Sequence, residues 1–177
     1  MRRLIAVLAA SALLLTVVGV AVANGDSNRN AFKARLGGFQ ETPAISTTGS
    51  GSLEVTVNGG GTALAYNLKF SNLQGGSAGA AHIHIGQAGV AGGVAAFLCG
   101  GGGKPACPAA GGTVSGTIQA ADVLAIPAQG LAAGDLGSLL KAMRAGVTYA
   151  NVHTATFPGG EIRGQIGGRG NGKGDKN

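Results

Sequence analysis

The sequence predicts a mainly β protein with one short helix. Two observations carry this prediction. Apolar and polar residues alternate in many short segments, and glycine, which accounts for 35 of the 177 residues, is concentrated between them. Successive side chains of a strand point to opposite faces, so such alternation is typical of strands buried on one side. Short strands joined by glycine-rich turns favour an antiparallel sandwich or barrel.

The alternation is clearest in the N-terminal half of the chain. Leu53, Val55 and Val57 alternate with polar residues, and the same pattern returns over residues 64–70. The glycines at 59–61 predict a β-hairpin between these two segments, because glycine readily adopts the positive φ that tight turns require. Strands are expected at 32–36, 53–57, 64–70, 80–85, 94–99, 113–118, 147–153 and 161–166.

A helical pattern interrupts the strands at about residues 135–145. Its apolar residues recur at helical spacing and form one stripe: Leu136, Leu139, Leu140 and Met143. Asp135 is a suitable N-cap, and Gly146 can take the left-handed conformation that often ends a helix. A stripe of leucine and methionine belongs to a core more often than to a cofactor site, so the helix is expected to pack on the end or flank of the strands.

The N-terminus has the pattern of a secretory signal peptide over residues 1–23. Arg2 and Arg3 precede an uncharged apolar run over 4–22, and small residues at 21 and 23 fit a cleavage site after Ala23. The expected location is therefore secreted or extracytoplasmic. The run is long for a signal peptide, so an uncleaved membrane anchor is the alternative.

The remaining chain is expected to be one domain with two tails. Residues 24–30 form a polar lead-in, residues 31–166 the domain, and the glycine-rich basic segment 167–177 a disordered tail. The net charge of +6 leaves only +2 on residues 31–166, and no dense basic stripe is present, so nucleic acid is not an expected partner. No second apolar stretch is long enough to span a membrane after signal cleavage.

Two cysteines, Cys99 and Cys107, enclose a flexible glycine-rich segment. Disulfides persist in exported proteins, so we predict a disulfide, which closes a short loop and stabilises the fold by about 2–3 kcal/mol. A pair of thiolate metal ligands is the alternative, although the spacing is wider than usual for one.

All three histidines of the chain fall in two predicted strands. His82 and His84 share one face because they are two residues apart, and His153 can join them if its strand pairs nearby. Three neutral imidazoles suit zinc with an open fourth position, or copper. The alternatives are imidazoles that only hydrogen-bond to the backbone, and metal-free acid–base catalysis.

Glu161 and Arg163 share a face of the last predicted strand. If that strand forms a hairpin with the one carrying His153, Glu161 is a candidate to orient His153, as carboxylates do for metal ligands. The alternative is an ion pair on the protein surface, worth about 0–1 kcal/mol.

Three motifs resemble those of the chordin-type domain family, called CHRD. Residues 82–94 are similar to its His-x-His-x-Gly-x-x-Gly signature. Residues 146–154, followed by 158–165, are similar to its C-terminal signature, and residues 40–43 resemble its N-terminal element. The motifs together span residues 31–166. The loop between the two cysteines is not a general feature of the family.

The resemblance implies an immunoglobulin-like antiparallel β-sandwich and supplies no established catalytic residues. Growth-factor binding in chordin belongs largely to neighbouring cysteine-rich modules, which this chain lacks. We therefore expect a non-enzymatic binding or structural module outside the cell, with an extracellular or cell-surface partner that the sequence does not name. The second hypothesis is a small copper- or zinc-binding protein that uses His82, His84 and His153, and the third is a metal-dependent enzyme.

Overall fold

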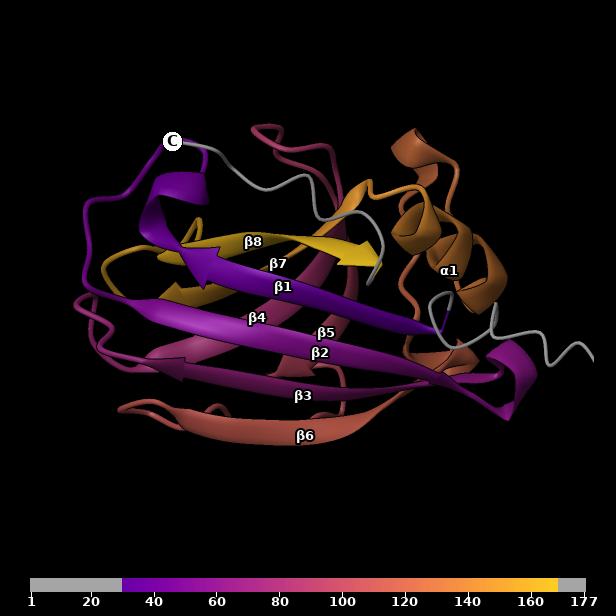
Figure 1. Cartoon of the computed structure of the whole chain (residues 1–177), viewed down its shortest axis with the longest axis horizontal. Coiled ribbons are helices and arrows are strands. Elements are labelled where there is room, and N and C mark those ends of the chain that lie inside the picture. The colour runs from indigo at the N-terminus through magenta and orange to yellow at the C-terminus, as the bar shows by residue number, and fades with distance from the viewer. Residues whose placement is uncertain (1–29, 169–177) are drawn as a thin grey trace, which may run out of the picture.

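Across residues 30–168, the part of the chain that this computed structural model describes, eight antiparallel strands and one α-helix form the fold (Figure 1). The strands are β1 (Ala31–Gly37), β2 (Ser50–Asn58), β3 (Ala63–Ser71), β4 (Ala78–Ile85), β5 (Val94–Cys99), β6 (Gly112–Gln119), β7 (Thr148–Thr154) and β8 (Ile162–Gly168), and the helix is α1 (Leu136–Arg144). The mainly β prediction is confirmed, and each predicted strand is present with ends that differ by at most three residues.

The predicted signal peptide, nearly all of the lead-in and most of the predicted tail lie outside the described residues. The tail prediction began too early, because Gly167 and Gly168 belong to β8. They pair with Lys33 and Phe32 of β1. These two glycines have no side chain to bury, and backbone hydrogen bonds to the neighbouring strand are what extend β8 through them.

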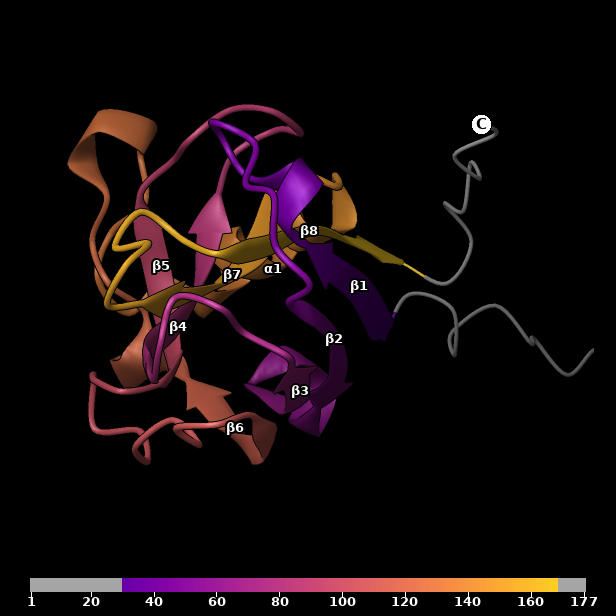
Figure 2. The same cartoon turned by 90° about the vertical axis from the view of Figure 1, so that its left-hand side faces the viewer.

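The strands form one continuous sheet in the order β5-β4-β7-β8-β1-β2-β3-β6. In Figure 2 the strands β8, β1, β2, β3 and β6 follow one another around a common interior, and β4, β5 and β7 lie on its other side, so the sheet is nearly closed and barrel-like. An immunoglobulin-like sandwich has two facing layers of strands. Here the two layers are the halves of one sheet, which are joined where β8 pairs with β1. The predicted hairpin joins β2 to β3 through Gly59–Gly61.

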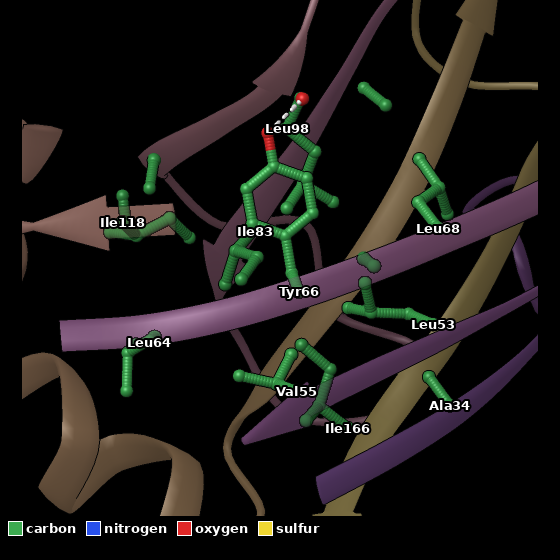
Figure 3. Close-up of a cluster of buried hydrophobic side chains, with 14 of the residues drawn as sticks. Ala34, Leu53, Val55, Leu64, Tyr66, Leu68, Ile83, Leu98, Ile118 and Ile166 are labelled. Atoms are coloured by element: carbon green, nitrogen blue, oxygen red, sulfur yellow. Dashed lines mark hydrogen bonds between the residues drawn. The ribbon is translucent and has the colours of Figure 1, made fainter. Parts of the chain in front are cut away.

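The core fills the interior of this sheet with alternate residues from facing strands. Figure 3 shows Leu53 and Leu68 from one half of the sheet packed with Ile83 and Ile166 from the other. These four side chains have no exposed surface. Full burial of such a side chain contributes about 1.5–3 kcal/mol, so contacts between the two halves hold the sheet in its curved shape.

The seam between the edge strands β5 and β6 is closed by contacts other than a strand ladder. The Tyr66 hydroxyl reaches from β3 across the core and donates to the Leu98 carbonyl of β5, with 2.6 Å between the oxygens (Figure 3). The predicted disulfide between Cys99 and Cys107 is present at the end of β5. Beyond β6, the Leu124 amide donates to the Ala95 carbonyl of β5.

Helix α1 packs beside one end of the sheet, as Figure 1 shows, and the four predicted stripe residues are buried. The Asp135 side chain accepts a hydrogen bond from the Ser138 amide at 2.8 Å, and Gly146 has a φ of 70°, so both predicted ends of the helix are confirmed. Among the described residues, no helix has the length and apolar character needed to cross a membrane.

Candidate metal centre

The sheet face opposite the core carries a buried layer of polar and aromatic side chains on β4, β7 and β8. Ile83 and Val152 point into the core, so their neighbours along each strand point to this other face. The polar layer comprises His82, His84, Tyr149, Asn151, His153 and Arg163. Polar residues buried in this way require internal hydrogen-bond partners or a ligand.

The three histidines meet within this layer. In the pairing of β4 with β7, Ala80 lies opposite His153 and His82 opposite Asn151, so His153 is one step diagonal to His82. His82 Nδ1 and His153 Nε2 are 2.9 Å apart. One ring nitrogen from each histidine lies within 4.8 Å of the others. The predicted convergence of His82, His84 and His153 is therefore present in the structure.

Backbone carbonyls fix the orientation of two of the rings. His84 Nδ1 is 2.9 Å from the Gly92 carbonyl oxygen, and His153 Nδ1 is 2.9 Å from that of Pro158. A carbonyl only accepts, so each Nδ1 is the protonated nitrogen and each Nε2 carries a lone pair. His84 Nε2 and His82 Nε2 are buried and have no hydrogen-bond partner among the described residues.

Burial keeps the three imidazoles in their neutral form. It lowers the pKa of His82 to about 3, with His153 and His84 as further causes because a neighbouring positive charge opposes protonation. Burial also lowers the pKa of His84 and that of His153, against the hydrogen bonds to Gly92 and Pro158. Neutral imidazole is the form that binds metal ions, so the site needs no proton release near pH 7.

Aromatic rings wall the histidines on two sides. Phe97 of β5 meets His82 edge-on, with ring centres 4.4 Å apart. Tyr149 stacks parallel to His84 at 4.7 Å, and its hydroxyl accepts from the Gly92 amide. These contacts restrict the two rings of β4, with Nδ1 of His82 facing His153.

Arg163 fastens the loop over the polar layer. Its guanidinium lies 3.4 Å from the centre of the Tyr149 ring and donates to the carbonyls of Gln87 and Val90 at 2.9 and 3.0 Å. Arg163 is 2% exposed, and no ion pair with Glu161 is present in the described part of the chain. The expectation of a surface ion pair was therefore wrong for Arg163, because the 86–93 loop covers it.

Glu161 has a different role from the one considered for it. Its carboxylate is fully buried and accepts from the Thr47 and Thr154 hydroxyls and the Gln74 and Gly75 amides. Burial alone would raise its pKa, but these hydrogen bonds outweigh burial and lower it. Glu161 thus ties two loops to β7. The group that orients His153 is the Pro158 carbonyl.

The family model described as the CHRD domain matches residues 32–166, which include every member of the polar layer. The chain belongs to the CHRD domain family. The comparison with curated proteins and the comparison with solved structures found no match.

Two buried residues at or beside the histidines of this CHRD domain, Asn151 and Glu41, were not identified from the sequence. Asn151 lies two residues before His153, so strand periodicity placed it on the histidine face and was a usable signal. Glu41 follows β1 and lies next to Asn151 above Gly160, in a loop far away in sequence, a position that no local pattern indicates. Glu41 is 8% exposed, and its Oε1 has no hydrogen-bond partner among the described residues.

Proposed function

We propose that this CHRD-domain protein is a non-enzymatic metal-binding module of the cell exterior, which holds one copper or zinc ion through His82, His84 and His153. One observation carries the proposal. Two imidazoles have Nδ1 bound to backbone carbonyls, and so present Nε2 lone pairs to a common buried region. This tautomer and this second contact are typical of metal-bound histidines.

The donor set and its spacing fit such an ion. Neutral imidazoles bind copper and zinc well, and no carboxylate or thiolate is needed. Nitrogens bound at 2.0–2.1 Å lie about 3.4 Å apart in a tetrahedral site. The nitrogens here lie within 4.8 Å of each other and as close as 2.9 Å, so ring shifts of about 1 Å suffice.

Two features support a location outside the cell. Residues 1–23 have the pattern of a secretory signal, and the Cys99–Cys107 disulfide is of the kind that persists in oxidising compartments. The protein would then bind its metal ion outside the cell, and any partner that receives the ion would be extracellular or on the cell surface.

The proposal is tested by metal stoichiometry and affinity in protein made without a histidine tag. We expect about one copper or zinc ion per chain near pH 7, and a loss of affinity of more than about 100-fold in His84→Ala. The matched control is Gln129→Ala. Gln129 fastens the same loop through Gly93 and Ile85 but offers no ring nitrogen, so this variant should retain the metal.

The pH at which the ion is released gives a second readout. Because burial lowers the pKa of each imidazole, the folded site stays neutral below the ordinary histidine value of about 6.5, and release should occur below that pH. Wild-type protein that binds neither copper nor zinc stoichiometrically near pH 7 would show that the proposal is wrong.

A further inference from the structure

We infer that Asn151 supplies the fourth ligand of the proposed centre through Oδ1, which makes it a closed site of three nitrogens and one amide oxygen. The inference rests on the proposed function. Asn151 is 2% exposed and lies directly opposite His82 in the pairing of β4 with β7. Its side chain projects from the same face as His153, so it lies among the three imidazoles.

The orientation of the Asn151 amide is set from its other end. Nδ2 donates to the Gly159 carbonyl at 3.4 Å. A side chain on Gly160 would collide with both Asn151 Nδ2 and Glu41 Oε1, which therefore occupy neighbouring positions above that glycine. Turning the amide over would place its oxygen against the Gly159 carbonyl, which only accepts. The amide oxygen is thus directed away from that carbonyl and toward His153.

The contact between Asn151 and His153 brings two acceptors together. Asn151 Oδ1 lies 2.9 Å from His153 Nε2. A neutral imidazole has a single N–H, and the Pro158 carbonyl holds it at Nδ1 of His153, so no hydrogen of His153 lies between Nε2 and the amide oxygen. In the metal-free protein the Nε2 lone pair accepts from His82 Nδ1 at 2.9 Å, so Asn151 Oδ1 lies at hydrogen-bond distance from His153 without receiving a hydrogen from it, whereas a cation bound to both atoms would satisfy the amide oxygen.

The spacing of the donors favours copper(II) as the ion to test. Both neighbours of His153 Nε2, which are His82 Nδ1 and Asn151 Oδ1, lie at 2.9 Å. Two ligands at about 2.0–2.1 Å from one ion have this separation when the angle between them is about 90°. Right angles between nitrogen and oxygen donors are typical of square-planar or tetragonal copper(II).

The experiment compares copper(II) binding by the full chain and its Asn151→Ala and Asn151→Asp variants. Affinity is measured by competition with a chelator, and directly bound water by pulsed EPR in oxygen-17-enriched water. Wild-type protein should show no strong coupling from an equatorial water. Asn151→Ala should bind copper at least about tenfold more weakly and gain that coupling, while Asn151→Asp should keep an oxygen ligand and bind at least as tightly as wild type.

The control and the contrary outcomes separate this inference from the proposed function. Asn67→Ala makes the same change on an exposed part of β3 and should leave copper binding unaltered. An equatorial water in copper-loaded wild type, or weaker binding by Asn151→Ala without a gain of water, would show that Asn151 is not a ligand. Failure of wild type to bind copper(II) or zinc would instead overturn the proposed function. If Asn151→Ala does not fold, the measurements on wild type and Asn151→Asp still decide the question.

Discussion

The two buried glutamates of this domain differ in how their charge is satisfied. Glu161 accepts hydrogen bonds from two hydroxyls and two amides, which lowers its pKa despite burial. Glu41 has no such set of donors. Burial raises its pKa to about 7, although the Arg163 charge and the Thr42 amide act in the opposite direction. The same side-chain type is therefore a fixed anion at one position and a titrating group at the other.

The raised pKa of Glu41 predicts a pH-dependent cost to stability. Between pH 4.5 and about 7 the unfolded state releases this proton and the folded state keeps it, so the free energy of unfolding falls as pH rises through this window. A rise of the Glu41 pKa from 4.5 to about 7 corresponds to a loss of about 3 kcal/mol in the free energy of unfolding once the pH is above this window. In metal-free protein, Glu41→Gln should be more stable than wild type above pH 7, and this advantage should shrink toward pH 4.5.

Thermal unfolding of the two proteins at several pH values checks this prediction. The difference between variant and wild type is the useful quantity, because the histidines shift the stability of both proteins in the opposite direction. Their lowered pKa values mean that unfolding takes up protons below about pH 6.5, so acid destabilises both. A difference that does not change with pH would contradict the assignment to Glu41.

At the scale of single elements, β5 depends on contacts from outside its own strand pair. It pairs only with β4 among the described strands, and its register is interrupted there by irregularities near His82 and His84. Tyr66 provides a hydrogen bond to Leu98 from across the core. A buried carbonyl that loses such a partner retains the cost of its desolvation, so this one side chain has a large effect on the edge of the sheet.

Tyr66→Phe should therefore destabilise the fold by about 1–3 kcal/mol while leaving the ring packing in place. Chemical unfolding measures the loss, and amide hydrogen exchange should show it concentrated in β5. Thr62→Val is a suitable control, because Thr62 makes a similar hydroxyl-to-carbonyl bond in the exposed turn before β3. We expect that control to change stability by less than about 0.5 kcal/mol. Equal stability of Tyr66→Phe and wild type would contradict the role given to the hydroxyl.

On the scale of the whole molecule, closure of the barrel depends on the long excursion from β5 to β6. That segment contains the disulfide and Lys104, whose ammonium group donates to the Thr117 carbonyl of β6 at 2.6 Å and pairs with Asp122. The two edge strands are thus linked by their connecting loop. Because His82 packs on Phe97 of β5, the seam also supports one wall of the proposed metal centre.

Removal of the disulfide should loosen this seam. The double variant Cys99→Ala/Cys107→Ala should lose about 2–3 kcal/mol of stability, mainly because its unfolded chain gains freedom. Lys104→Met tests the same loop without touching the disulfide, and as a partly exposed contact should cost about 1 kcal/mol or less. Chemical unfolding under non-reducing conditions measures both variants. A double variant as stable as wild type would show that the other seam contacts suffice.

The sequence by itself determined the features that depend on residues close together in the chain. Alternation placed the eight strands, apolar spacing and caps placed α1, and the spacing of His82 and His84 put both on one face, because side-chain direction in a strand or helix repeats with a fixed local period. Family membership also followed from short motifs, and the match over residues 32–166 agrees with it.

Only the tertiary structure decided what surrounds those residues. The order of strands brought His153 beside His82, joined β8 to β1 to make one barrel-like sheet, and covered Arg163 with a loop. It also gave the orienting role to a backbone carbonyl instead of Glu161, and placed Asn151 at the centre with Glu41 beside it. These are contacts between distant segments, fixed by strand pairing and by the need of buried polar groups for partners, and no local period encodes them.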